Sequence, residues 1–135
     1  MAFLCEYNAQ FYDTTLGRLR RQAELRARQG GPLGLEGVQE IIVGAKDFEI
    51  AQRNWQELFA PIIPSSPGLW KIGDGPAIHL VPHTQDRLLA LIWKVASLEQ
   101  ARAILGEQAM LGTSTERQLS LAPTKTFGLD IRLVE

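Results

Sequence analysis

The chain has 135 residues, of which 45% are hydrophobic and 21% are charged, and its formal net charge is −1. This length and balance are typical of one globular domain, and the small net charge gives no long-range attraction for nucleic acid or an anionic membrane. The single cysteine, Cys5, excludes an intrachain disulfide framework. There is no apolar run long enough for a transmembrane helix and no signal-peptide pattern. We therefore expect a cytoplasmic protein without nucleic-acid or membrane partners.

Residues 1–36 are predicted to form an N-terminal arm made of a short strand and a helix. Residues 2–7 alternate between the two faces of a short strand. A helix is predicted over residues 13–29, because this stretch has a modest apolar stripe and is followed by a Gly-Gly-Pro stop. The arginines of this helix are interpreted as a solvated surface, since no aromatic residues are interleaved with them as in a nucleic-acid patch.

Residues 37–82 are predicted to form the first of two repeat units. A strand over residues 38–45 is followed by Asp47, which is suited to cap a helix by accepting hydrogen bonds from its first free N–H groups. An apolar helical stripe comes next, and two prolines end it. The segments 69–72 and 77–81 then form a hairpin across a Gly-Asp-Gly turn.

Residues 88–135 are predicted to form the second unit, which begins with a strand at residue 88. Ser97 and Gln100 have the spacing of a capping box at the start of a helix. Two closing strands, over residues 117–122 and 129–134, complete the unit.

The two units repeat one another without a gap. Residues 38–51 reappear as residues 88–101, with strand, cap and helix start in the same order, and the last strands also match. A repeated unit fixes the architecture before any chemistry is considered. We predict an α+β fold in which two βαββ units form one curved mixed sheet with a concave polar cup, and in which the helices cover the other face.

Strand alternation divides the predicted sheet into an aliphatic face and a polar face. The polar face carries Glu40, His79, Lys94, Gln118, Ser120, Asp130 and Arg132. If the two halves curl toward each other, these side chains line a cup with both charge signs, which is a candidate binding site. A sheet with one face simply open to water gives the same alternation.

Two short sequences that lead from a strand into a helix carry a family resemblance. They are Gly44-Ala-Lys-Asp-Phe-Glu-Ile-Ala51 and Lys94-Val-Ala-Ser-Leu-Glu-Gln-Ala101. Together with the paired units they resemble the vicinal oxygen chelate superfamily, which includes glyoxalase I, extradiol dioxygenases, fosfomycin-resistance enzymes and bleomycin-binding proteins. The resemblance covers residues 37–135 and implies a glyoxalase-like domain, although a shared fold does not imply a shared function.

The resemblance also implies four metal-ligand positions in the cup. They fall on Glu40, His79, Ala90 and Arg132. Glutamate and histidine are capable ligands, whereas alanine has no donor and a guanidinium repels a cation. We therefore expect no cofactor, with a divalent metal on Glu40 and His79 as the alternative. From the residues alone, Glu40 has a structural interpretation as an ion-pair partner of Arg132 or Lys94, and His79 as a partly buried hydrogen-bonding side chain.

Three functions remain open. The first, which we prefer, is a module that binds a small organic ligand, with Arg132 and Lys94 as charge partners for an anion and Trp70 as an apolar wall. Its expected ligand-binding residues are Glu40, Trp70, His79, Lys94, Gln118 and Arg132. The second is a metal-dependent lyase, isomerase or dioxygenase that uses Glu40 and His79. The third is a dimerisation scaffold without catalysis.

A homodimer is expected, and the N-terminal arm suggests how a second chain would contribute. Residues 3–7 resemble the closing strand of a preceding unit, where the family often keeps a glutamate ligand. The chain would then be similar to the C-terminal half of a longer paired-domain member. In that arrangement, Glu6 of one chain completes the metal site of Glu40 and His79 in another.

Overall fold

The structure is a computed structural model that describes residues 15–135. Its helices are α1 (Thr15–Ala27), α2 (Phe48–Phe59) and α3 (Leu98–Glu107), with a 3-10 turn at Pro123–Lys125. Its strands are β1 (Leu35–Ala45), β2 (Leu69–Lys71), β3 (Ala77–Pro82), β4 (Arg87–Val95), β5 (Leu111–Ser114), β6 (Gln118–Leu121) and β7 (Asp130–Val134). The strand predicted at residues 2–7 lies outside the described residues.

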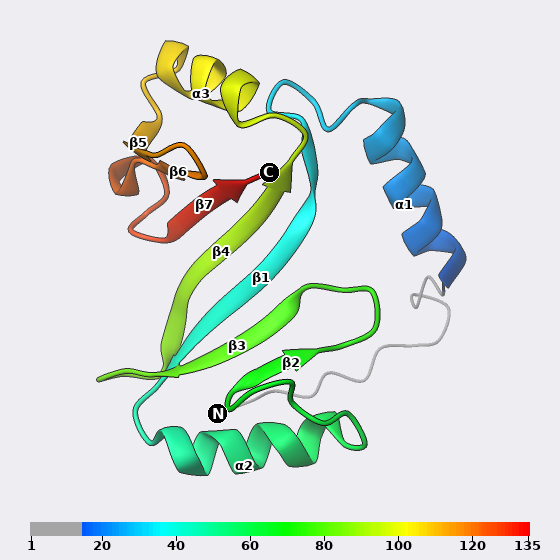
Figure 1. The fold of residues 1–135 in the computed structure, drawn as a ribbon, viewed down its shortest axis with the longest axis vertical. Helices are drawn as coiled ribbons and strands as arrows, with labels where there is room; N and C mark the ends of the chain where they lie inside the picture. The colour runs from blue at the N-terminus through cyan, green and yellow to red at the C-terminus, as the bar shows by residue number, and fades with distance from the viewer. Residues whose placement is uncertain (1–14) are drawn as a thin grey trace.

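The strands of this part of the chain form one mixed sheet in the order β2-β3-β1-β4-β7-β6-β5. β1 and β4 are the first strands of the two predicted units, and they pair antiparallel at the centre. Each also pairs in parallel with the last strand of its own unit, β1 with β3 and β4 with β7. In Figure 1 the two halves extend in different directions from this central pair, with α2 at the bottom and α3 at the top. The predicted α+β fold with duplicated units is confirmed.

The two halves differ by one strand. The second half contains β5, which the sequence pattern did not predict because only its first residue, Leu111, is a large apolar side chain and the other three residues are exposed. After α2, the first half has only an isolated bridge between Ser66 and Leu69. Pro61 and Pro64 precede this bridge, and proline cannot donate to a strand ladder. The second unit is therefore βαβββ, and the first is βαββ.

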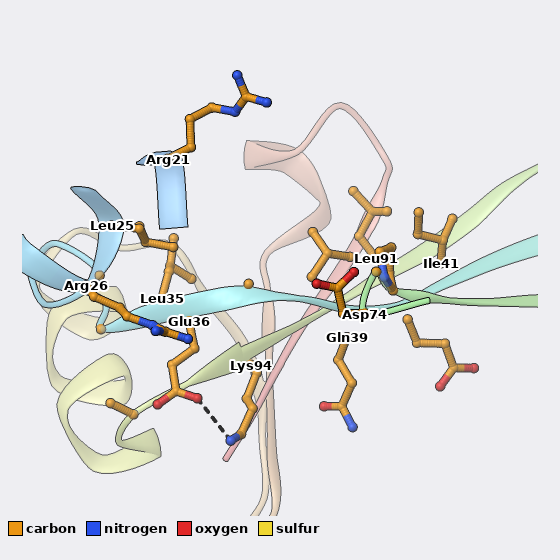
Figure 2. A pocket seen from close by; sticks show the side chains of 18 of the residues that line it. Arg21, Leu25, Arg26, Leu35, Glu36, Gln39, Ile41, Asp74, Leu91 and Lys94 are labelled. Atoms are coloured by element: carbon orange, nitrogen blue, oxygen red, sulfur yellow. Dashed lines mark ion pairs between the residues drawn. The ribbon is translucent and has the colours of Figure 1, made fainter. Parts of the chain in front are cut away.

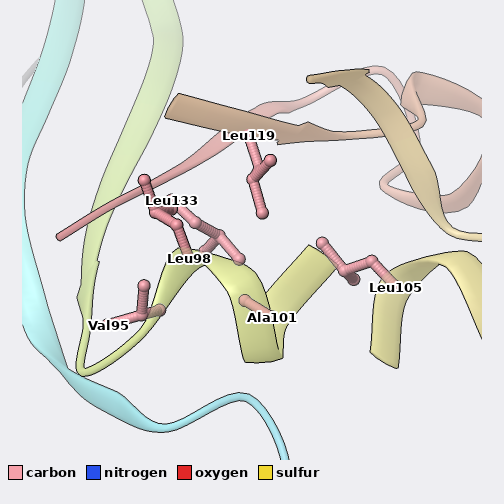
Figure 3. Close-up of a cluster of buried hydrophobic side chains, with 6 residues drawn as sticks. All are labelled: Val95, Leu98, Ala101, Leu105, Leu119 and Leu133. Carbon is pink, nitrogen blue, oxygen red and sulfur yellow. The ribbon is translucent and has the colours of Figure 1, made fainter. Parts of the chain in front are cut away.

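α2 and α3 cover separate hydrophobic clusters on the same face of the sheet. The cluster under α3 buries Val95, Leu98, Ala101, Leu105, Leu119 and Leu133 (Figure 3). The cluster under α2 buries Ala45, Trp70 and Leu80. A row of paired residues crosses this face from one half to the other: Trp70, Ile78, Ile41, Leu91 and Ile131. Both helices therefore cover the aliphatic face, as the alternation predicted.

Trp70 lies in the core beneath α2, so its prediction as an apolar wall of the cup is wrong. It is 0% exposed, its ring stacks on Trp55 with centroids 6.3 Å apart, and its Nε1 donates a hydrogen bond to Gln56 Oε1 at 3.0 Å. Its neighbours on β2, Leu69 and Lys71, fall on the opposite face because side chains alternate. The register of this three-residue strand decides the face, and the sequence did not reveal it.

One of the two predicted helix caps is confirmed in its N-cap bond only, because the Gln100 side chain donates to the Pro32 carbonyl oxygen at 2.9 Å and does not turn back to Ser97 as in a capping box. Ser97 is extended, and its side-chain oxygen accepts a hydrogen bond from the backbone N–H of Gln100 at 3.2 Å. Asp47 precedes α2 at φ −107° and ψ 77°, outside the extended geometry of a cap residue, and its side chain makes no cap hydrogen bond. The prediction of Asp47 as a side-chain cap is therefore wrong.

α1 joins the sheet through a tight turn at its C-terminal end. Gly30 has a φ of 70°, its N–H donates to Leu25 O at 2.9 Å, and its carbonyl accepts from Leu35 N at 2.9 Å. A Cβ at Gly30 would lie 2.1 Å from Leu35 N, so this turn requires glycine. None of the described helices is long and apolar enough to cross a membrane.

Gly68→Ala is expected to destabilise the protein more than Gly73→Ala. Both residues have φ in the left-handed region, at 76° and 59°, so each substitution strains the backbone by about 1–2 kcal/mol. A Cβ at Gly68 would also lie 2.3 Å from the carbonyl oxygen of Leu80, whereas nothing lies within 4 Å at Gly73. Overpacking should bring the cost at Gly68 to about 2–5 kcal/mol. Urea unfolding of both variants tests this, and equal losses would contradict it.

Candidate functional site

The face of the sheet opposite α2 and α3, here called the polar face, brings the predicted site positions together. The strand register arranges its residues in rows. One row contains Ala77, Glu40, Ile92, Arg132 and Ser120, and the next contains His79, Ile42, Ala90 and Asp130. A third row contains Lys94, Val134 and Gln118. The four positions at which the resemblance implied metal ligands therefore surround the central pair β1–β4.

Glu40 and His79 contact each other on the polar face. Nδ1 of His79 lies 2.7 Å from Oε1 of Glu40, and the two side chains are 35% and 25% exposed, His79 being the more exposed. The parallel pairing of β1 with β3 causes this contact, because it places His79 beside Ile42, two residues along β1 from Glu40. The structure thus pairs Glu40 with His79 instead of with Arg132 or Lys94, the partners considered from the sequence.

Arg132 contacts Asp130, two residues earlier on β7. Its Nε and Nη2 atoms both contact Oδ2 of Asp130, at 2.8 and 2.6 Å. The Arg132 side chain remains 36% exposed. The guanidinium therefore contacts Asp130 through Nε and Nη2 and is still accessible. Asp130 was predicted on the polar face but not in the site, although its i, i+2 spacing from Arg132 on a strand was the signal that could have linked them.

Lys94 lies at one end of the polar face in an ion pair with Glu36 (Figure 2). Nζ of Lys94 is 3.0 Å from Oε2 of Glu36, and both side chains are about half exposed. A pair this exposed contributes about 0–1 kcal/mol. The predicted strand began at residue 38 and left Glu36 in the N-terminal arm, whereas β1 begins at Leu35, which is why the sequence did not identify Glu36. Gln118 shares the row of Lys94 on the more distant strand β6.

The donors on the polar face do not fit a divalent metal ion. Ala90 has no donor atom, Arg132 is a cation, and Oε1 of Glu40 is engaged by His79. Within residues 15–135 there is no group of three or more His, Cys, Asp or Glu side chains that could hold a metal. Glu6 lies outside the described residues, so completion of a metal site by another chain stays a prediction.

A broad open groove of about 1630 Å³ borders one end of the polar face. It is formed by α1, the first half of β1 and the turn between β2 and β3 (Figure 2). The groove exists because β3 pairs with β1 only from Glu40 onwards, which leaves the earlier residues of β1 without a strand on that side. Glu40 and Lys94 line the groove, whereas His79, Gln118 and Arg132 do not. Ile41 and Leu91 of the aliphatic face line it as well, so the groove lies at the edge of the sheet and does not enclose the centre of the polar face.

Comparison with known proteins finds similarity in structure only. No protein-family model matches the sequence, and no curated protein matches it. A methylmalonyl-CoA epimerase from Mycobacterium tuberculosis matches with a TM-score of 0.60 at 17% identity, over 78% of this chain and 90% of that chain. A substituted methylmalonyl-CoA epimerase from Streptomyces coelicolor, in complex with 2-nitronate-propionyl-CoA, matches with a TM-score of 0.51 at 13% identity, over 74% and 96%. A hypothetical protein from Bacillus halodurans has a TM-score of 0.51 at 12% identity, over 73% and 92%.

At these identities the likeness concerns the fold alone. The methylmalonyl-CoA epimerases are members of the vicinal oxygen chelate superfamily. The features shared with that fold are the mixed sheet, the duplicated units and their junction through the first strand of each. The chain therefore has the fold of the vicinal oxygen chelate superfamily, as its sequence resemblance predicted.

Proposed function

We propose that the polar face binds a small organic anion without a metal ion, and that Arg132 pairs with the anionic group. The observation that carries this proposal is an accessible guanidinium at a position where the resemblance implied a metal ligand. Among the contacts of the described residues, Asp130 engages the Nε and Nη2 atoms of Arg132. Nη1 therefore remains for a ligand, and charge-assisted N–H···O bonds to carboxylate or phosphate are the strong interactions of arginine.

Apolar side chains beside Arg132 support an organic rather than an inorganic anion. Ile92 is the partner of Arg132 on β4, and Ile42 occupies the neighbouring row, and both are partly exposed. Binding sites for small molecules are lined mainly by apolar groups with a few placed polar ones. Arg132 on one side and the Glu40–His79 pair on the other give the polar face this composition.

The ligand of a protein with the same fold also supports an organic anion. The Streptomyces coelicolor epimerase is in complex with 2-nitronate-propionyl-CoA, which is an anionic compound. An acyl-CoA is therefore one member of the ligand class to be tested beside simple carboxylates.

Arg132→Leu is expected to weaken anion binding by about tenfold to a hundredfold. A hydrogen bond to a charged group is worth about 1.5–3 kcal/mol, which corresponds to this loss of affinity. Titrations of chelator-treated protein with malonate, benzoate and propionyl-CoA, followed by ligand-observed NMR, measure the affinities.

Arg53→Leu is the matched control, because it removes the same charge from an exposed position on α2, across the sheet from the polar face. It should leave the affinities unchanged. The proposal is wrong if no probe binds saturably, if Arg132→Leu binds as tightly as the natural chain, or if binding requires an added divalent metal.

A further inference from the structure

The contact between Glu40 and His79 determines which ring nitrogen of His79 is left for a ligand. Nδ1 of His79 and Oε1 of Glu40 are 2.7 Å apart. An ionised carboxylate has no proton to donate, so Nδ1 must carry the proton of this hydrogen bond. In a neutral imidazole, the other nitrogen is then an acceptor.

We infer that Nε2 of His79 is a fixed hydrogen-bond acceptor on the polar face, and that the ligand is a hydroxylated organic acid. Its carboxylate pairs with Arg132, and its hydroxyl donates to Nε2. This inference rests on the proposed anion site and adds a second recognition point to it. His79 is 35% exposed in its side chain, so the nitrogen not used by Glu40 can be reached by a ligand.

The two recognition points lie on β3 for His79 and on β7 for Arg132, three strand spacings or about 14 Å apart across the sheet. Glu40 and Arg132 lie in one row, with Ile92 of β4 between them. Two strand spacings place their Cα atoms about 10 Å apart. A carbon chain lying over Ile92 would connect the Arg132 guanidinium to His79.

The polar groups of the site would discriminate against acids that lack the hydroxyl. When a bound ligand covers Nε2 without donating to it, the acceptor loses its water and gains no partner. A site built to hydrogen-bond a hydroxyl therefore rejects the analogue without it. Carboxylates without a donor should bind to Arg132 but more weakly.

The tautomer of His79 can be measured directly in the full-length protein. The chain has only two histidines, so a long-range ¹H–¹⁵N spectrum contains two imidazoles, and His83→Phe assigns them. At a pH where the rings are neutral, we expect the proton of His79 on Nδ1. Glu40→Ala, which removes the acceptor, should lower the share of the tautomer that is protonated on Nδ1. A proton on Nε2 of His79 in the natural chain would overturn the inference without any ligand or variant.

A ligand series tests the second half of the inference. Terminally hydroxylated butanoate and hexanoate are compared with the unsubstituted acids and with their methyl ethers, which keep the oxygen but cannot donate. At least one hydroxy acid should bind about threefold to tenfold more tightly than both analogues, as one net hydrogen bond provides. His79→Phe should remove this preference. His83→Phe should keep it, because His83 lies in the loop after β3 with its Nδ1 3.0 Å from the Gln85 carbonyl oxygen.

The outcomes separate this inference from the anion site itself. Equal affinities for hydroxy acids and their analogues in the natural chain, with Arg132 still required, would overturn the donor-bearing ligand and leave the anion site standing. Loss of the preference in His83→Phe rather than in His79→Phe would also overturn it. If no acid binds, both proposals fail.

Discussion

Trp70→Ala is expected to lower the free energy of unfolding by about 3–5 kcal/mol, the cost of truncating a fully buried aromatic side chain. Trp70 is 0% exposed and touches two rings of α2, with centroids 6.3 Å away at Trp55 and 5.6 Å away at Phe59. The substitution also removes the donor to Gln56 Oε1. Urea unfolding followed by circular dichroism gives the change in free energy.

Ile63→Ala is the control for this loss. Ile63 lies in the loop after α2 and is 82% exposed, so its truncation should change stability by less than about 0.5 kcal/mol. A cost below about 1 kcal/mol for Trp70→Ala would mean that the indole does not lie in the core. It would restore the interpretation of Trp70 as a side chain that lines the polar face.

The repeat predicted most of the fold because strand, cap and helix are encoded locally. Ser97 followed by Gln100 is a local signal, and the structure contains its hydrogen bond. Features that depend on the partner strand were not predictable. β5 forms because Leu111 pairs with Leu121 of β6, and its own sequence has little strand character. The face of Trp70 likewise depends on its pairing with Ile78.

The sequence predicted which residues of the candidate site share one face of the sheet, but not which of them contact each other. Alternation alone placed Glu40, His79 and Arg132 on one face, and the register agrees. It did not predict that His79 would engage Glu40, because that contact depends on the register between β1 and β3. It also did not predict that Asp130 would contact Arg132 on the same strand, because that contact depends on side-chain direction. The pairing of β1 with β4 has a register shift between Leu35 and Gly37, and Glu36 at this shift forms the ion pair with Lys94 of β4.

Leu119→Ala is expected to destabilise the second half of the sheet by about 2–5 kcal/mol. Leu119 is 0% exposed and belongs to the cluster beneath α3 together with Leu105 and Leu133 (Figure 3). Leu58→Ala is the matched control, because Leu58 is 49% exposed on α2 and should cost less than about 1 kcal/mol. Similar losses in the two variants would show that Leu119 is not part of a packed core.

The cluster beneath α3 shares no buried residue with the cluster that contains Trp70, so losses in the two should add. The two alanine variants together would remove much of the roughly 5–15 kcal/mol that stabilises a typical domain, so milder changes are needed to measure additivity. Trp70→Phe and Leu119→Val should combine within about 0.5 kcal/mol. They should still unfold in one transition, because the antiparallel pair β1–β4 joins both halves into one sheet. Two separate transitions would instead mean that the duplicated units are independent folding units and that the central pair does not couple them.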